Sequence, residues 1–373
     1  MTFYVMGFGD MVGLATDYVK RDFDLSSTLT QVLTIMAFVW FFLLSVPFGI
    51  FQDKHSKKIT VIIAILFTIA SMLAPIFSST FYGMLVSFTL LGIGNTILQV
   101  SANPLMQDIS HPAKFTRNLT LSVFVKAVAG MAGPVIAAFC ASKFGNWMLI
   151  YWVYLILCIV SLLWLYFTPI EESGNTGRAN ISSTLKLLRD RKVTFLVLGT
   201  FVMVGFDVGM NTNIANYLKT SFGVSQEEAI VGISIYFAAL MAGRFVGALI
   251  LNRFQGKKML LYCAILSVVS FALLYLASDF NTGRIAIFCI GLFTATIFPL
   301  IFSTGLQYMP ERANELSGLM IMSVCGGAVI PFFVGLMTDL ANLMVALLLL
   351  GVCLVYVVFL SLYIIKTKKY SFE

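Results

Sequence analysis

Apolar runs of about twenty residues follow one another along almost the whole chain, and each is long enough to cross the hydrocarbon core of a bilayer as a helix. Of the 373 residues, 59% are hydrophobic and only 11% are charged, whereas about a quarter of the residues in soluble domains are charged. The runs do not alternate between apolar and polar residues, as the strands of membrane barrels do. The sequence therefore predicts an all-α polytopic membrane protein.

We predict twelve transmembrane helices. Their ranges are 1–19, 29–51, 59–79, 81–106, 118–142, 146–168, 193–217, 229–252, 258–277, 283–307, 314–338 and 341–365. A polar connector over 169–192 separates the sixth span from the seventh. The predicted domains are thus an N-terminal six-helix bundle over 1–168, a cytoplasmic linker over 169–192 and a C-terminal six-helix bundle over 193–373.

The distribution of positive charge predicts the orientation. Of the 24 Lys and Arg residues, 17 lie in the tail and in the loops after the even-numbered spans, and only 5 lie in the opposite loops. Short cytoplasmic loops carry the excess of Lys and Arg in membrane proteins. We therefore expect both termini in the cytoplasm of a bacterial-type plasma (inner) membrane, and we interpret the net charge of +7 as a topology signal, not as a nucleic-acid site.

The two halves resemble each other. A shift of 199 positions aligns "DYVKRDFDLS" (17–26) with "NYLKTSFGVS" (216–225). The same shift pairs Asp53 with Asn252, Lys54 with Arg253 and Gly92 with Gly291, and a shift of 197 pairs Gly130 with Gly327 and Pro134 with Pro331. Parallel repeats of this kind build many transporters. The repeat predicts two pseudo-symmetric six-helix bundles.

The loop "GIFQDKHSKK" (49–58) resembles the signature between helices 2 and 3 of the major facilitator superfamily. Gly49 permits close helix contact, Asp53 can pair with a neighbouring helix end, and Lys54 and the lysines after it hold the cytoplasmic face. Together with twelve spans and the repeat, this resemblance implies the major facilitator fold and a secondary active transporter.

Two further segments are similar to the fucose–proton symporter family. They are "GIGNTILQVSANP" (92–104) and "GRFVGALIL" (243–251). This resemblance implies a proton-driven importer of sugars. Members of that family usually carry a glutamate where Gln99 stands, and their first-span aspartate falls nearer Gly13 than Asp10, so the acid of the first span becomes the better candidate for proton coupling.

Aspartates occupy the first and seventh spans. An ionised carboxylate near the bilayer centre costs about 2.5–3.5 kcal/mol and needs a cavity, a partner or a proton. We interpret Asp10 and Asp207 as proton-coupling residues. The alternative for Asp10 is a permanent ion pair with Lys126, and for Asp207 it is substrate binding or a structural pair with Arg244.

Side-chain amides form a second pattern. Asn95, Gln99 and Asn103 recur every four residues and share one stripe of the fourth span, and Asn211 shares a face with Asp207 in the seventh. Amides donate and accept hydrogen bonds and so match hydroxyl-rich ligands. In the superfamily these spans line the central cavity, which implies sugar recognition. The alternative is hydrogen bonding between helices.

Lys126 and Arg244 lie inside spans. Two cations in a cavity favour an anionic substrate, such as a sugar acid or another organic anion, and this stays open beside the sugar. An exporter or antiporter of the same fold is a further alternative. For Arg244 we favour a structural role, because the symporter family carries this arginine in its own motif.

Aromatic and bending residues complete the candidate set. Trp40 and Tyr236 can stack on a sugar ring, although packing is the more common role of such residues. Pro104 and Pro299 can bend gating helices, and Gly243-x-x-x-Gly247 suits a close helix crossing.

We expect no enzyme, cofactor or metal site. The cysteines all lie in apolar spans, the two histidines lie in predicted loops, and no cluster of nucleophile, base and acid is visible. A membrane-bound sensor would usually carry a larger soluble domain. The expected partners are a small-molecule substrate, a proton and the lipid bilayer, and the transporter is expected to be a monomer.

Overall fold

The computed structural model describes residues 1–11, 18–19, 22–24, 27–172 and 179–366, while the side chains of a few of these, Asp10 among them, lie outside the description. All regular elements in these ranges are helical, so the all-α prediction is confirmed. Ten helical segments are long and apolar enough to cross a membrane, and they coincide with the predicted spans three to twelve. The first two predicted spans contain residues outside the described ranges, so the count of twelve stays a prediction.

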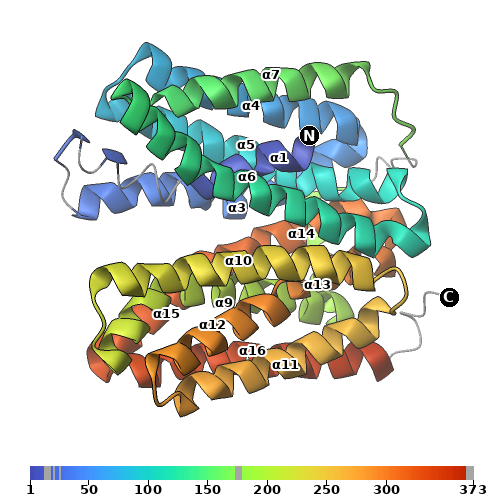
Figure 1. The fold of residues 1–373 in the computed structure, drawn as a ribbon. Coiled ribbons are helices and arrows are strands. Elements are labelled where there is room, and N and C mark those ends of the chain that lie inside the picture. Colours follow the sequence, from blue (N-terminus) through green and yellow to red (C-terminus); the bar gives the residue numbers. More distant parts are fainter. Residues whose placement is uncertain (12–17, 20–21, 25–26, 173–178, 367–373) are drawn as a thin grey trace. The chain divides into compact units, whose positions relative to one another are not determined.

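The chain forms two compact units. Unit 1 contains Met1–His111, Ser122–Lys186 and Glu311–Met322. Its helices are α1 (Thr2–Met6), η1 (Gly7–Met11), α3 (Ser27–Lys54), α4 (Lys57–Phe77), α5 (Phe81–Ile109), α6 (Phe115–Phe144) from Ser122 onward, α7 (Leu149–Phe167), α8 (Ile181–Lys186) and α14 (Ala313–Met322). Within this unit α5 packs against both α3 and α4, and α7 lies along α4 (Figure 1).

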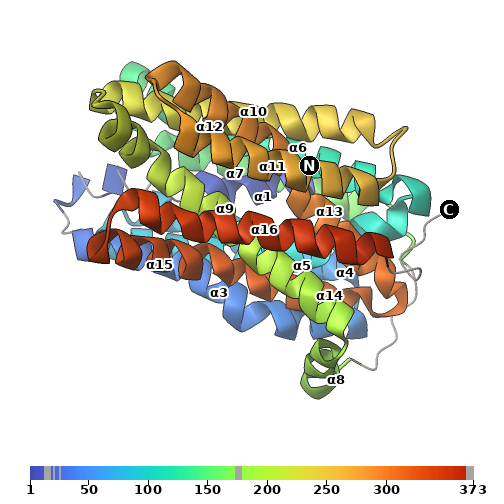
Figure 2. The same cartoon turned by 90° about the horizontal axis from the view of Figure 1, so that it is seen from below.

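Unit 2 contains Pro112–Leu121, Leu187–Pro310 and Ser323–Glu373. Its helices are η2 (Pro112–Lys114) with the first turns of α6, η3 (Leu187–Arg189), α9 (Arg191–Phe222), α10 (Gln226–Ile250), α11 (Gly256–Leu276), α12 (Phe280–Thr294), α13 (Ile297–Tyr308), η5 (Ser323–Cys325), α15 (Gly326–Leu340) and α16 (Leu343–Lys366). The turn η4 (Pro310–Arg312) leads from unit 2 into unit 1. Within unit 2 α16 lies beside α9 and α15 (Figure 2).

Two segments belong to the unit that is formed mainly by the other half of the sequence. The start of α6 up to Leu121 is part of unit 2, and Glu311–Met322 is part of unit 1. The two points where the helical chain changes unit, after Leu121 and after Met322, are equivalent in the repeat to within a few residues. The compact units therefore differ from the predicted domains in these two segments, each of which belongs to the other unit. The connector up to Lys186 belongs to unit 1.

Prolines affect the helices unequally. The predicted tenth span separates into α12 and α13 at Ala295–Thr296. Pro299 has no backbone N–H to donate to the carbonyl of Ala295, which explains the break. By contrast, α5 continues through Pro104. The predicted eleventh span is also interrupted, by the 3₁₀ turn η5 between α14 and α15, whereas its repeat counterpart α6 is one continuous helix.

Short polar side chains begin several helices. Ser56 accepts a hydrogen bond from the amide of Ile59 at 3.2 Å, and Asp279 accepts from the amide of Asn281 at 3.0 Å. Ser225 and Glu228 form a capping box at the start of α10. Gly223, with φ of 66°, ends α9 in the left-handed conformation that favours glycine.

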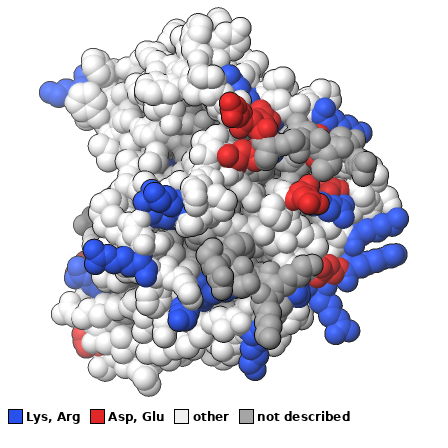
Figure 3. Space-filling model, turned by 90° about the vertical axis from the view of Figure 1, so that its right-hand side faces the viewer, with Lys and Arg blue, Asp and Glu red and all other residues white. Residues whose placement is uncertain are grey.

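Large apolar side chains such as Phe77, Val135 and Trp164 are exposed along the helices. Figure 3 shows, in contrast, a face of the molecule on which charged side chains of both signs gather. Exposed apolar surface on this scale is a liability in water and is suited to lipid contact. The distribution fits an integral membrane protein.

Candidate functional site

Two glycines place the first helical segment directly against α5 and α6 in unit 1. A Cβ added to Gly7 would stand 2.4 Å from the backbone oxygen of Lys126, and one added to Gly9 would stand 1.9 Å from the amide nitrogen of Asn95. Only glycine permits such close approach of a backbone. Asp10 follows Gly9 in η1, so its backbone lies beside the two helices that carry Asn95 and Lys126. The Asp10 side chain lies outside the described part of the chain.

The predicted amide stripe is present on α5 and is buried. Asn95, Gln99 and Asn103 are 9%, 8% and 4% exposed. The Gln99 amide donates to Asn95 Oδ1 at 3.4 Å, and the Asn103 amide donates to the backbone oxygen of Gln99 at 2.8 Å. The stripe is thus held along its own helix, with Asn95 against the first helical segment.

The glycines of "GIGN" bring the neighbouring helices close to this stripe. A Cβ on Gly92 would stand 2.4 Å from the backbone oxygen of Ala37 in α3, and one on Gly94 would stand 2.7 Å from the Thr68 hydroxyl in α4. Trp40 lies one helical turn beyond Ala37 and is half-buried. Its indole Nε1 is buried and has no hydrogen-bond partner among the described residues.

In unit 2 the structure joins two predicted residues from different helices. The Tyr236 hydroxyl of α10 donates to Asp207 Oδ1 of α9 at 2.6 Å. The Tyr236 side chain is fully buried, so it offers no ring face to a sugar. The stacking role predicted for Tyr236 does not fit this placement, because the ring fills the interior of the unit and its hydroxyl is engaged by the carboxylate.

The predicted close crossing of α10 is confirmed. A Cβ on Gly243 would stand 2.4 Å from the backbone oxygen of Leu292, and one on Gly247 would stand 2.3 Å from the Thr296 methyl group. The contact brings α10 to the α12–α13 break that precedes Pro299. Arg244, next to Gly243, is half-buried, and its Nε is buried without a hydrogen-bond partner in the described part of the chain.

Asn211 lies one turn after Asp207 on α9 and is half-buried. Lys126, in α6 of unit 1, is half-buried as well. The structure therefore groups the candidates within each unit: Asp10, Trp40, the amide stripe and Lys126 in unit 1, and Asp207, Asn211, Tyr236, Arg244 and Pro299 in unit 2.

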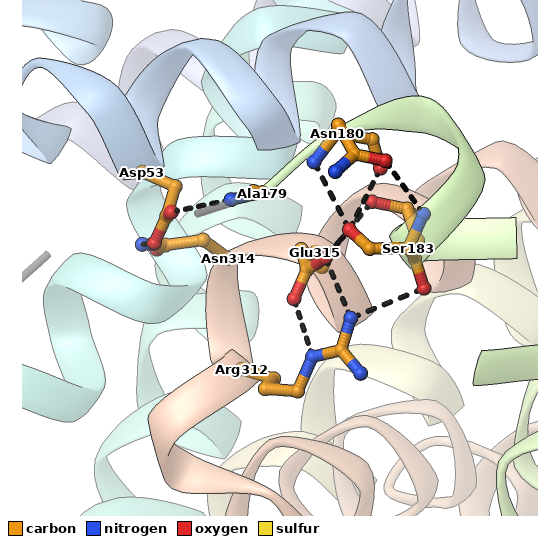
Figure 4. A network of polar contacts seen from close by, with 8 residues as sticks. Asp53, Ala179, Asn180, Ser183, Arg312, Asn314 and Glu315 are labelled. Atoms are coloured by element: carbon orange, nitrogen blue, oxygen red, sulfur yellow. Dashed lines mark hydrogen bonds and ion pairs between the residues drawn. The ribbon is translucent and has the colours of Figure 1, made fainter. Parts of the chain in front are cut away.

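The signature loop forms a second, tightly bonded cluster in unit 1 (Figure 4). Asp53 is 3% exposed and accepts hydrogen bonds from the Asn314 side-chain amide at 3.1 Å and from the backbone amide of Ala179 at 3.3 Å. Gly49 lies one turn earlier, and a Cβ there would stand 2.8 Å from the backbone oxygen of Asn314. Asp53 thus meets the first turn of α14. Lys54 is exposed.

Glu315 holds α14 to the connector helix α8. It accepts from Arg312 Nε at 2.6 Å, from the Ser183 hydroxyl at 2.7 Å and from the Thr184 hydroxyl at 3.2 Å (Figure 4). Sequence reasoning missed these residues. The available signal was the spacing of Arg312 and Glu315, three apart just after Pro310, which is common in the first turn of a helix.

The lysines of the loop are engaged by acids that sequence reasoning also missed. Lys57 forms a buried ion pair with Asp108 at the end of α5. Glu172 of the connector accepts from the backbone amides of Lys57 and Lys58 at 2.7 and 2.9 Å and from the Ser56 hydroxyl. The carboxylate therefore binds the amino end of α4, where the helix dipole favours an anion.

Unit 2 repeats part of this cluster with other side chains. Arg117 Nη1 donates to Asn252 Oδ1 at 2.8 Å. Asn252 is the repeat counterpart of Asp53, and Arg117 is the counterpart of Asn314. The two pairs therefore occupy equivalent positions in the two halves.

Comparisons with known proteins agree with this architecture. The family model described as Major Facilitator Superfamily matches residues 1–331 and, in a second match, 196–371. A glucose/galactose transporter of Brucella abortus biovar 1 (strain 9-941) is 24% identical over 97% of this chain and 92% of its own length. A putative glucose/galactose transporter of Helicobacter pylori (strain J99) is 25% identical over 96% of this chain and 94% of its own.

Solved structures share the fold. The Escherichia coli fucose:proton symporter has a TM-score of 0.84 at 18% identity, over 97% of this chain and 96% of that one. A human organic anion transporter has a TM-score of 0.78 at 15% identity, over 96% of both chains. Because the family model covers most of the residues, and because the helices and the signature loop agree with it, the chain belongs to the Major Facilitator Superfamily.

Proposed function

We propose that this transporter imports a sugar together with a proton by alternating access. It would do so as a monomer in a bacterial inner membrane, with both termini in the cytoplasm. Two kinds of relative support the substrate class: proteins named as glucose/galactose transporters, which match over nearly their whole length, and a fold neighbour named as a fucose:proton symporter.

The observation that carries the proposal is the amide stripe of α5 lying against the segment that contains Asp10. Asn95 touches Gly9, and Asp10 is the next residue. Amides recognise hydroxyl groups by donating and accepting hydrogen bonds, and a carboxylate within the membrane binds a proton when it is desolvated. Substrate and proton sites next to each other allow one to depend on the other.

We therefore assign roles to the candidates as follows. Asp10 and Asp207 bind protons; Asn95, Gln99, Asn103, Asn211, Lys126 and Trp40 bind substrate; and Gly49, Asp53, Lys54, Arg244, Pro104 and Pro299 serve gating or structure. Tyr236 is assigned to the Asp207 site and not to substrate binding, because its hydroxyl donates to the Asp207 carboxylate.

The test is uptake into proteoliposomes with a panel of neutral sugars and imposed proton or sodium gradients. We expect one or more sugars to accumulate when the proton gradient points inward. Asp10→Asn should abolish this accumulation while retaining counterflow exchange, which needs no net proton movement. Accumulation driven by sodium alone, or undiminished accumulation by the variant, would contradict the proposal.

An anionic substrate is the second candidate, favoured by the buried Nε of Arg244, which has no hydrogen-bond partner among the described residues. A carboxylate would satisfy this donor with a charge-assisted hydrogen bond. The same panel should therefore include sugar acids. A sugar acid that outcompetes every neutral sugar, with a preference lost in Arg244→Gln, would establish this alternative in place of the first.

A further inference from the structure

Tyr236 and Tyr217 are both buried in unit 2, but their hydroxyls have different partners. Tyr217 donates to the backbone oxygen of Leu274 at 2.6 Å, and the half-buried Tyr356 donates to that of Phe195 at 2.9 Å. These bonds join one helix to the backbone of another. Tyr236 donates to the Asp207 carboxylate instead, at 2.6 Å. A bond to an ionised oxygen is about twice as strong as one to a neutral acceptor.

The backbone around Tyr236 leaves the ring little freedom. A Cβ on Gly291 of α12 would stand 2.8 Å from the backbone oxygen of Tyr236 and 3.1 Å from its ring carbon Cδ2. The same crossing occurs in unit 1, where Gly92 lies against the backbone oxygen of Ala37. Ala37 is the repeat counterpart of Tyr236. The fold therefore needs only a small residue at this position, and the hydroxyl is an addition specific to unit 2.

The face of α9 opposite Asp207 packs closely against apolar side chains. A Cβ on Gly205 would meet Ile330 of α15 at 2.3 Å, and one on Gly209 would meet Leu350 of α16 at 2.7 Å. Polar groups near Tyr236 include the Arg244 guanidinium of α10 and the Thr294 hydroxyl of α12. The 197-residue shift pairs Asp207 with Asp10, whereas Tyr236 corresponds to Ala37, so the tyrosine partner of the acid belongs to unit 2.

We propose that Tyr236 is a positioning residue, whose hydroxyl holds the Asp207 carboxylate in the orientation in which it exchanges a proton during transport. This inference rests on the proposed proton coupling and deepens it. In the ionised state Asp207 accepts the Tyr236 hydrogen. When Asp207 takes up a proton this charge-assisted bond weakens, so protonation releases the carboxyl group from α10.

The experiment uses Tyr236→Phe in proteoliposomes, and it measures both proton-driven accumulation and counterflow exchange of the same sugar. Phenylalanine keeps the ring and removes the hydroxyl. We expect accumulation to fall about ten-fold more than counterflow, as expected for the loss of a hydrogen bond to a charged group. A purely structural role would lower both by the same factor through the amount of folded protein.

Tyr217→Phe is the matched control, because it also deletes a buried tyrosine hydroxyl bonded across helices in unit 2. It should lower accumulation and counterflow equally. Asp207→Asn gives a second measurement. If Tyr236 acts through Asp207, the double variant Asp207→Asn with Tyr236→Phe should be no more uncoupled than Asp207→Asn alone.

The outcomes separate the two proposals. A wild-type transporter that shows no proton-driven accumulation would refute the proposed function. If the wild type is coupled, two results would refute the role of Tyr236 alone. In the first, Tyr236→Phe behaves like Tyr217→Phe. In the second, accumulation in the double variant falls by the product of the two single reductions. If Tyr236→Phe does not fold, Asp207→Glu becomes the deciding variant, because it keeps the carboxyl group but moves it relative to the Tyr236 hydroxyl, and unchanged coupling in it would overturn the inference.

Discussion

The repeat places two hydrogen-bonded pairs at equivalent positions, and the two are built very differently. Asp53–Asn314 in unit 1 is buried, with exposures of 3% and 6%, and Asp53 has a second donor in Ala179. Asn252–Arg117 in unit 2 is exposed. The positions of the two pairs are thus retained while their chemistry differs. The buried Asp53 binds Asn314 of one exchanged segment, whereas the exposed Asn252 binds Arg117 of the other.

The two pairs should therefore contribute differently to the free energy of unfolding. A buried donor left without its acceptor costs about 1–3 kcal/mol, whereas an exposed pair contributes about 0–1 kcal/mol. We therefore expect unit 1 to hold residues 311–322 firmly and unit 2 to hold residues 112–121 more loosely. Four substitutions test this asymmetry.

Gly318→Leu should have the largest effect. A Cβ at this position would stand 2.8 Å from the backbone oxygen of Ser45, so α14 and α3 would have to separate. Overpacking of this kind costs about 1–3 kcal/mol or more, and we expect a clear fall in the midpoint of thermal unfolding in detergent. Gly335→Leu on α15 is the control, because a Cβ there meets no atom within 4 Å. An equal fall in both variants would contradict the close crossing.

Asp53→Ala should come next. It leaves the Asn314 amide and the Ala179 N–H without their acceptor in a buried place, at a cost of about 1–3 kcal/mol. Asn252→Ala is the matched change in unit 2, and we expect less than about 0.5 kcal/mol for it. Equal shifts of the unfolding midpoint in the two variants would remove the asymmetry that the structure indicates.

Glu315→Gln should have an intermediate effect. The change weakens the bonds from Arg312, Ser183 and Thr184, but the Arg312 side chain is 37% exposed and solvent screens the pair. We expect a loss of about 1 kcal/mol, measured by chemical unfolding, that becomes smaller at high salt. A loss as large as that of Asp53→Ala would mean that the connector contact matters as much as the signature acid.

Asn252→Asp should have the smallest effect, and its sign is opposite. It gives Arg117 an ionised partner at the surface, worth about 0.2–1 kcal/mol. The gain should disappear in 1 M salt, where exposed charges are screened. A gain that persists in high salt would show that this pair is more buried than in the structure.

The sequence predicted much of the architecture, because apolar runs, glycine crossings and prolines act locally. Spans three to twelve were found, and the crossing at Gly243 and Gly247 followed from residue spacing alone. The exchange of the α6 and α14 segments could not be predicted, because hydrophobic periodicity shows where helices are and leaves open which helices pack together.

The site was predictable only as a set of residue types. Asp207 and Tyr236 were both singled out, but they lie on different helices, and no spacing rule joins positions 29 apart. The same holds for Lys57 with Asp108 and for Glu172 at the start of α4. Partners of this kind depend on tertiary packing, which the spacing of residues in a single sequence does not show.

The connector is held to unit 1 at two points, by Glu172 at the first turn of α4 and by the backbone of Ala179 at Asp53. Both contacts hold this part of the connector to unit 1 independently of each other. Loss of the Asp53 carboxylate should therefore loosen the backbone just before α8 while the contact of Glu172 with α4 remains.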